Sequence, residues 1–190
     1  VNFPAEFHAQ TAAEAAIKLH PQIAFDDIAH INIHTQEPGI RIISKQGPLT
    51  NYADRDHCIE YIVAWCLLNG NLDANSYTDE AASDSRIDSL REITSTTENT
   101  EYTNRYYNLD ERAIPNKVTV TLKNGDVMEE EVIYPLGHRE RREESKPYLK
   151  QKFNNSLDNT GLDQTFLSDA YNSLDLDKVE IYDILKKIYK

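Results

Sequence analysis

The chain has 190 residues, of which 39% are hydrophobic and 27% charged, a composition typical of globular proteins rather than disordered or fibrous ones. A chain of this length forms one or two domains that bury a core of their own. Its 32 acidic residues against 20 basic ones give a net charge of -12, which would repel a phosphate backbone and excludes a nucleic-acid partner. No apolar run approaches the length of about 18 residues that a membrane-spanning helix needs, so we expect a soluble protein without a membrane partner.

The cysteines and the first residues bear on the origin of the chain. Cys58 and Cys66 are the only cysteines and lack C-x-x-C spacing, so we expect no disulfide framework and a reducing, cytoplasmic location. The chain starts at Val1, its only methionine is Met128, and its opening residues do not resemble a signal peptide. We therefore expect a piece of a longer polypeptide.

The first part of the chain predicts one helix and two strands. The alanine-rich residues 4–20 carry apolar side chains at spacings of three and four and end at Pro21, which indicates an amphipathic helix. Residues 28–35 alternate between apolar and polar side chains, as in a half-buried strand. A turn at Pro38-Gly39 and the apolar run 40–44 then predict a second strand.

The most apolar segment, residues 55–68, predicts a helix that is buried on nearly every side. Asp54 is a suitable N-cap, and Asn69-Gly70 is a typical C-terminal stop. Beyond it, residues 84–92 predict a further helix, and the polar residues 94–108 predict a connecting loop.

The clearest predicted motif is a β-hairpin in the second half of the chain. Residues 117–123 and 126–134 alternate and are joined by Asn124-Gly125, the strongest short-range signal for a tight hairpin. The rest of the chain predicts helices at 146–157, 163–174 and 179–189. Together these elements predict an α+β fold: a small antiparallel or mixed β-sheet with packed helices, followed by C-terminal helices.

His30, Asn32 and His34 share one face of the predicted strand, with the two imidazoles about 7 Å apart. Two histidines at this distance are the beginning of a metal site, but no third or fourth ligand with recognisable spacing lies nearby. We therefore favour a solvent-facing strand surface and predict no metal.

His57 and Tyr61 lie four residues apart near the start of the apolar helix, a spacing that stacks them on one face. With Arg55 and the helix N-terminus they would form one corner of a binding site for an anion. The alternative is a core histidine and tyrosine that find hydrogen-bond partners among their neighbours.

A basic segment, residues 137–142 (GHRERR), stands out in this acidic chain. Its arginines are suited to hold a carboxylate or a phosphate. The alternative is a solvated helix flank whose arginines pair with Glu143 and Glu144.

Three longer segments carry a resemblance to a known family. Residues 3–12 (FPAEFHAQTA), 47–61 (GPLTNYADRDHCIEY) and 134–142 (YPLGHRERR) resemble, in this order, the C-terminal part of MmgE/PrpD family members. The resemblance implies that residues 1–145 are an α+β lid-type domain that closes over the active-site cleft. It also implies that residues 146–190 are a helical segment that packs on the missing N-terminal helical domain of the same chain.

The resemblance also implies an activity, namely a lyase without iron–sulfur cluster or other cofactor. It removes water from 2-methylcitrate to give 2-methyl-cis-aconitate in the methylcitrate cycle of propionate catabolism. The piece alone is then expected to be inactive, with a small tricarboxylate as substrate and a homo-oligomer as an open possibility. The alternatives are a decarboxylase or epimerase of the same family, or a module that only docks the helical domain.

Removing a proton next to a carboxylate builds negative charge, so the site needs cationic groups, a base and an acid. By the resemblance, Tyr61 matches a tyrosine that reaches the active site in related decarboxylases, and His57 precedes it in the same way. A relative has a histidine aligned with Glu6, whereas this chain has His8 two positions later. The predicted catalytic residues are Tyr61, His57 and His8, within one concave region, and the predicted substrate-binding residues are Arg55, Glu6, His138, Arg139 and Arg142.

Overall fold

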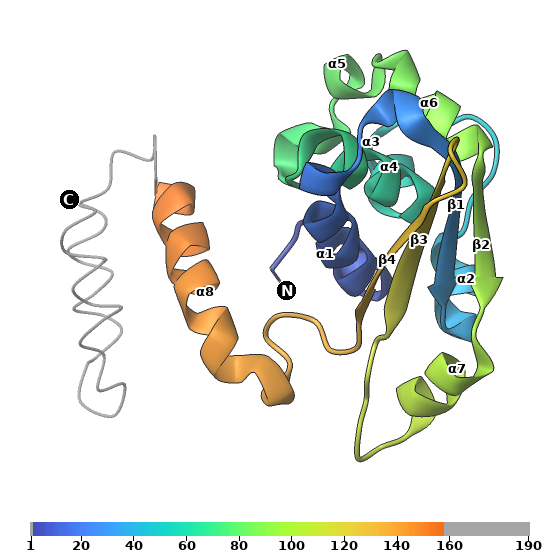
Figure 1. Cartoon of the computed structure of the whole chain (residues 1–190). Coiled ribbons are helices and arrows are strands. Elements are labelled where there is room, and N and C mark those ends of the chain that lie inside the picture. The colour runs from blue at the N-terminus through green and yellow to red at the C-terminus, as the bar shows by residue number, and fades with distance from the viewer. Residues whose placement is uncertain (1, 158–190) are drawn as a thin grey trace, which may run out of the picture. The chain divides into compact units, whose positions relative to one another are not determined.

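A computed structural model of the chain describes residues 2–157 (Figure 1). The chain divides into two compact units, Val1–Glu143 and Glu144–Lys190. The sheet and the helices that cover it belong to the first unit. Within the described residues, no helix is long and apolar enough to cross a membrane.

The first unit is built on a four-stranded sheet with the strand order β2-β1-β3-β4 (Figure 1). The strands are β1 (Ile28–Thr35), β2 (Thr94–Glu98), β3 (Asn116–Leu122) and β4 (Val127–Val132). β1 runs parallel to β2 and antiparallel to β3, and β3 is antiparallel to β4. This mixed sheet with packed helices confirms the predicted α+β class.

The predicted hairpin is confirmed as the pair β3 and β4. Its turn is closed by two backbone hydrogen bonds, from Gly125 N to Leu122 O (2.9 Å) and from Leu122 N to Asp126 O (2.8 Å). Gly125 has a φ of +92°, a left-handed conformation that residues with a side chain rarely adopt. The local pair Asn124-Gly125 therefore fixes the hairpin and, through it, the register of half of the sheet.

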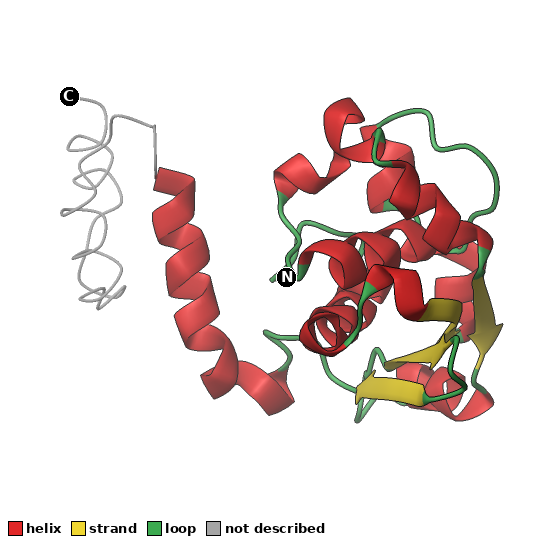
Figure 2. Ribbon diagram, turned by 45° about the horizontal axis from the view of Figure 1, so that its top comes forward, coloured by secondary structure: helices red, strands yellow, loops and turns green. Residues whose placement is uncertain are grey.

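The core lies between the sheet and two helices, α1 (Gln10–Leu19) and α4 (Ile59–Asn69), which pack against each other. Figure 2 shows the strands as a layer with helices beside it. Alternation along β1 buries Ile31 and Ile33 completely, and the polar residues His30, Asn32 and His34 are more exposed, as predicted. α4 is buried along most of its length and ends at Gly70, whose φ of +67° makes it a left-handed C-cap.

The apolar helix does not begin where the sequence predicts. A short helix, α3 (Tyr52–Asp56), precedes α4, and the backbone leaves the helical conformation at His57 and Cys58. Asn51 is the N-cap of α3, and its side chain accepts a hydrogen bond from Asp54 N, so the prediction of Asp54 as the cap is wrong. The tight turn closed by Cys58 N and Arg55 O separates the two helices.

The prediction of a second strand at residues 40–44 is also wrong. The segment forms the helix α2 (Glu37–Ile43), in which Pro38 occupies the first turn. Pro-Gly is compatible with both a turn and a helix start, because proline lacks the N–H that a first turn leaves unpaired. Both sides of β1 are already occupied by β2 and β3, so no edge of β1 remains for a further strand.

The predicted loop at residues 94–108 contains two regular elements instead. Its first part is the strand β2, and its second part is the helix α7 (Thr100–Tyr107), capped by Asn99. β2 has no apolar periodicity of its own, since its sequence is TSTTE, and it is formed by pairing with β1. A strand defined by a distant partner gives little local signal.

The remaining elements agree in part with the predictions. The helix predicted at 84–92 is confirmed as α6 (Ser85–Glu92), capped by Asp84. The opening helix begins later than predicted, because Glu6 caps a short 3-10 turn before α1. The other elements are η1 (Phe7–Ala9), η2 (His20–Gln22), η3 (Phe25–Asp27), η4 (Ala74–Tyr77), α5 (Asp79–Ala82), η5 (Arg139–Arg141) and α8 (Arg142–Leu157).

The helix predicted at residues 146–157 is the larger part of α8. The helices predicted at 163–174 and 179–189 lie outside the described residues. The implied packing of this C-terminal segment on a missing helical domain concerns mainly residues outside the described range too.

Candidate functional site

Glu6 and His8 form a hydrogen-bonded pair just before α1. The His8 Nδ1 atom lies 2.9 Å and 3.0 Å from the two carboxylate oxygens of Glu6, and His8 N donates to Glu6 Oε2 at 2.7 Å. Burial by itself would raise the pKa of Glu6, but the hydrogen bonds and the charge of His8 outweigh it and lower that pKa. Glu6 is therefore ionised at neutral pH and can only accept hydrogen bonds, which places a proton on His8 Nδ1.

The other ring nitrogen of His8 faces a residue that the sequence did not single out. His8 Nε2 lies 3.2 Å from the hydroxyl oxygen of Tyr106, and the two rings lie 5.5 Å apart between centroids. Tyr106 belongs to α7, 98 positions along the chain, so no spacing rule connects it to His8. The only signal is the tyrosine-rich sequence of α7, which we interpreted as part of a loop.

A backbone hydrogen bond places His57 near the Glu6–His8 pair. Glu6 N donates to Asp56 O at 3.1 Å, which joins the opening segment to the end of α3. The half-exposed His57 side chain pairs with the carboxylate of Asp56, with 2.5 Å between His57 Nδ1 and Asp56 Oδ1. The structure thus brings three of the predicted site residues, Glu6, His8 and His57, to one edge of the first unit.

Tyr61 points elsewhere. Its hydroxyl donates to the carbonyl of Ser76 at 2.7 Å, its ring stacks on Tyr77, and the side chain is 2% exposed. Burial raises the pKa of Tyr61 to about 12. The prediction that His57 and Tyr61 share one helical face is wrong, because the helix is interrupted between them.

Arg55 is buried and holds the segment around η4. One of its terminal nitrogens donates to Tyr77 O at 2.8 Å and pairs with Asp79 at 2.7 Å. Arg55 and Tyr61 therefore attach the same segment, residues 76–79, to α3 and α4. Their contacts in this structure are those of the core alternative.

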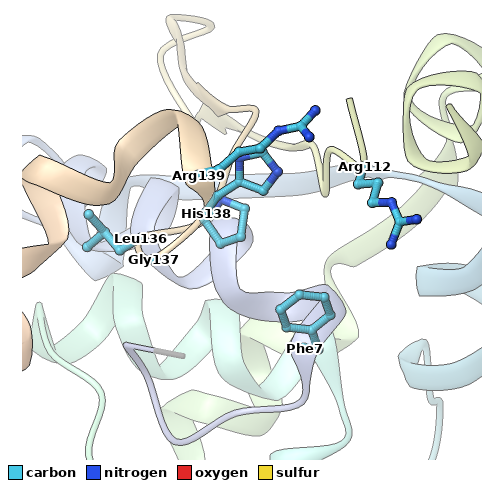
Figure 3. A pocket seen from close by; sticks show the side chains of 7 residues that line it. Phe7, Arg112, Leu136, Gly137, His138 and Arg139 are labelled. Carbon is cyan, nitrogen blue, oxygen red and sulfur yellow. The ribbon is translucent and has the colours of Figure 1, made fainter. Parts of the chain in front are cut away.

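A cavity of about 450 Å³ lies beside the opening segment (Figure 3). It contains two of the predicted substrate-binding residues, His138 and Arg139, together with an arginine that the sequence did not single out, Arg112. His138 stacks on Tyr134, with 4.6 Å between ring centroids. The full lining is Phe7, Arg112, Pro135, Leu136, Gly137, His138 and Arg139.

Arg112 adopts an unusual backbone conformation. With a φ of +49°, it is the sole non-glycine among the described residues that has a positive φ. Its N–H donates to Asn108 O at 2.7 Å, and the chain that follows is fixed by the buried residues Ala113 and Ile114. Left-handed backbone at a side-chain-bearing residue costs about 1–2 kcal/mol and is found preferentially at functional sites.

Two guanidinium groups and an imidazole around one cavity suit a ligand with several carboxylates. Guanidinium groups form two parallel hydrogen bonds to a carboxylate and stay charged at every relevant pH. The cavity is joined to the Glu6–His8 pair by Phe7, which lines the cavity and directly precedes His8.

The rest of the basic segment has other partners. Arg141 forms a bidentate ion pair with Glu14 of α1, at 2.8 Å and 2.9 Å, and donates to Tyr134 O. This pairing attaches the chain after β4 to α1 and serves the fold. Arg142 is the first residue of α8.

The strand histidines make polar contacts on an exposed surface. His30 lies within hydrogen-bond distance of Ser95, and His34 within that of Asn32 and Thr97. In the part of the chain that the structure describes, no group of three or more His, Cys, Asp or Glu side chains is arranged to hold a metal ion.

Comparison with known proteins supports the resemblance. The model of the MmgE/PrpD C-terminal domain matches residues 3–167. The 2-methylcitrate dehydratase, mitochondrial, of Yarrowia lipolytica is 54% identical over 159 residues, which are 80% of this chain and 31% of that protein. The 2-methylcitrate dehydratases of Cupriavidus necator and Escherichia coli K12 are 49% and 47% identical over 163 residues, 83% of this chain and 34% of each relative.

The chain spans about a third of the length of these relatives. The family model covers most of the chain, including the Glu6–His8 pair and the residues that line the cavity. The chain therefore belongs to the MmgE/PrpD family and corresponds to its C-terminal domain.

Proposed function

We propose that this chain is the substrate-covering C-terminal part of an enzyme that dehydrates 2-methylcitrate to 2-methyl-cis-aconitate, in the methylcitrate cycle of propionate catabolism. The printed names of its relatives support this activity. The structural observation that carries it is the Glu6–His8 pair beside a cavity with two guanidinium groups, Arg112 and Arg139. Proton transfer and binding of several carboxylates are the two requirements of this reaction.

The arginines of the cavity would offset the negative charge of the substrate and of the transition state. A tricarboxylate carries up to three negative charges, and removal of a proton next to a carboxylate adds further charge in the transition state. Arg112, Arg139 and His138 bind carboxylates in this proposal, and cationic donors that are held in place stabilise such charge without reorganisation. His57 lies at the same edge, directly after Asp56, whose carbonyl accepts a hydrogen bond from Glu6 N.

The two buried predicted residues have a different place in the proposal. For Tyr61 to transfer a proton to the substrate, its hydroxyl would have to leave the carbonyl of Ser76. For Arg55 to bind a carboxylate, it would have to leave Asp79 and Tyr77 O. We therefore propose that Tyr61 and Arg55 support the packing of α3, α4 and η4. For Arg142 we retain the predicted role of a substrate-binding residue.

The remainder of the site is expected from the preceding helical domain of a longer chain, with which this part would form the closed cleft. The fragment alone is then inactive, and a homo-oligomer of the complete enzyme is possible within this proposal. The cytoplasmic location stays a prediction, since the name of the Yarrowia lipolytica relative states that that protein is mitochondrial.

The proposal is tested in the complete enzyme by following formation of the conjugated double bond from 2-methylcitrate. We expect His8→Asn to lower kcat by about 100-fold or more, the usual contribution of a general acid or base. Arg139→Ala should raise KM, because its side chain is exposed and lines the cavity. His30→Ala, on the exposed strand surface, is the matched control.

Unchanged turnover in both site variants would leave only the docking role. Loss of carbon dioxide, or inversion of a stereocentre, in place of water loss would identify the enzyme as a decarboxylase or an epimerase of the same family.

A further inference from the structure

The hydrogen bonds around His8 determine which atom carries each proton. Glu6 accepts at both of its oxygens, so His8 Nδ1 is the donor toward Glu6. In the neutral state of His8, the imidazole has one N–H, at Nδ1, and Nε2 is therefore an acceptor. The group that faces Nε2 is the hydroxyl of Tyr106, which has one proton to give. The Tyr106 hydroxyl thus donates to His8, and its oxygen lone pairs remain available to a further group.

This order of groups, carboxylate, imidazole and hydroxyl, activates a hydroxyl in many enzymes. The imidazole takes the hydroxyl proton when the oxygen takes on another proton or bond, and the carboxylate stabilises the imidazolium that forms. Glu6 is placed for this role because it contacts His8 Nδ1 with both oxygens. Contacts of this kind hold the ring in one orientation.

The fold does not fully enclose the side chain of Tyr106. Its side chain is only partly buried, on α7, and Tyr107 next to it is 57% exposed. The titratable and charged groups near the Tyr106 hydroxyl are Glu6 on the opening segment, Tyr107 on α7, and Glu37 and Arg41 on α2. Burial and the neighbouring acidic groups raise the pKa of Tyr106, so it keeps its proton until His8 removes it.

We propose, on the basis of the dehydratase function above, that Tyr106 is a catalytic residue that exchanges protons directly with the substrate. His8 takes up and returns the Tyr106 proton, and Glu6 stabilises His8 while it holds that proton. The Tyr106 oxygen takes the proton from the carbon next to a substrate carboxylate, while the Tyr106 proton passes to His8 Nε2. The electron pair of the broken C–H bond forms the double bond, and the C–O bond breaks. The departing hydroxide receives the His8 proton through the Tyr106 hydroxyl and leaves as water, which restores all three side chains.

The test compares Tyr106→Phe with Tyr107→Phe in the complete enzyme. Both variants remove one hydroxyl and keep the ring, and the Tyr107 hydroxyl faces Glu37 rather than His8. We expect Tyr106→Phe to lower kcat by about 100-fold or more with little change in KM, as for the loss of a proton-transferring group. Tyr107→Phe should keep both constants. Full kcat in Tyr106→Phe would overturn the catalytic role.

A second measurement does not depend on turnover. In the substrate-free enzyme, nitrogen NMR of the His8 ring reports which nitrogen carries the proton and whether Nε2 accepts a hydrogen bond. We expect an Nδ1–H tautomer and a shift of the Nε2 signal in Tyr106→Phe but not in Tyr107→Phe. An unmoved signal, or a proton on Nε2, would overturn the chain of hydrogen bonds. If the unmutated enzyme fails to dehydrate 2-methylcitrate, the proposed function fails. The NMR result still decides whether the hydrogen bonds link Glu6, His8 and Tyr106 in this order.

Discussion

Replacing Tyr61 by phenylalanine separates its two interpretations, a proton-transferring group and a core hydroxyl. The hydroxyl makes one hydrogen bond of 2.7 Å, to Ser76 O, in a side chain that is 2% exposed. Its removal leaves a buried carbonyl without that donor, which costs about 1–3 kcal/mol. The ring stays, so its stacking on Tyr77 and its packing in the core are retained. We therefore expect Tyr61→Phe to lower the free energy of unfolding by that amount.

Urea unfolding of this chain and initial rates of the complete enzyme are the paired assays. Tyr52→Phe is the matched control, since Tyr52 contacts the same Tyr77 ring but is 43% exposed. We expect its stability to stay within about 0.5 kcal/mol of the unmutated chain, as at most surface positions. For Tyr61→Phe, an unchanged unfolding midpoint together with a large loss of kcat would refute the core interpretation and restore the predicted catalytic role.

Three further predictions concern the backbone, the cavity and pH. Gly70→Ala should lower the unfolding temperature more than Gly125→Ala. Both glycines have a positive φ, but an added Cβ at Gly70 would lie 2.5 Å from the His20 ring, whereas an added Cβ at Gly125 would meet no neighbouring atom within 4 Å. Arg112→Gly should stabilise the chain by about 1 kcal/mol in urea unfolding, because glycine adopts a positive φ without strain, while raising KM for the tricarboxylate; an unchanged KM would exclude Arg112 from the site. Because folding lowers the pKa of Glu6, its carboxylate stabilises the fold at pH values above 4.5, the ordinary pKa of a glutamate. This stabilisation is lost as the pH falls through the lower pKa that Glu6 has in the folded state. Glu6→Gln should therefore be less stable than the unmutated chain at neutral pH, and the difference should shrink in acid; a constant difference between pH 7 and strong acid would contradict the lowered pKa.

The features that the sequence predicted correctly are those with a local cause. Asn124-Gly125 specifies its hairpin by the conformations available to two residues, and Asp84 caps α6 within one turn. The alternation in residues 28–35 reports the two faces of β1. In the candidate site, the sequence named Glu6 and His8 but not their pairing, which depends on the turn that Glu6 caps.

The features that the sequence missed depend on distant partners. β2 is held by parallel pairing with β1, across more than sixty positions of chain, and its own residues do not alternate in polarity. α7 follows β2 and was missed with it, and so was Tyr106. Arg112 was missed because its importance depends on a positive φ and a cavity, neither of which leaves a pattern in the residue types around it.

The parallel pair of strands explains how Tyr106 comes to lie beside His8. The carboxyl ends of two parallel strands point to the same edge of a sheet, and the segments that follow them meet there. α2 follows β1 and α7 follows β2, and Glu37 N donates to Thr103 Oγ1 at 2.9 Å between the two helices. Asn99 N also donates to Thr35 O at 2.8 Å, which ties the start of α7 to the end of β1. These bonds set the position of α7, and therefore that of Tyr106, relative to the strand ends, while the opening segment brings Glu6 and His8 to the same place. The proposed proton-transfer chain thus depends on a strand pairing that contributes no residue to it, so a substitution that weakens the pairing of β2 with β1 should separate Tyr106 from His8 before it unfolds the core.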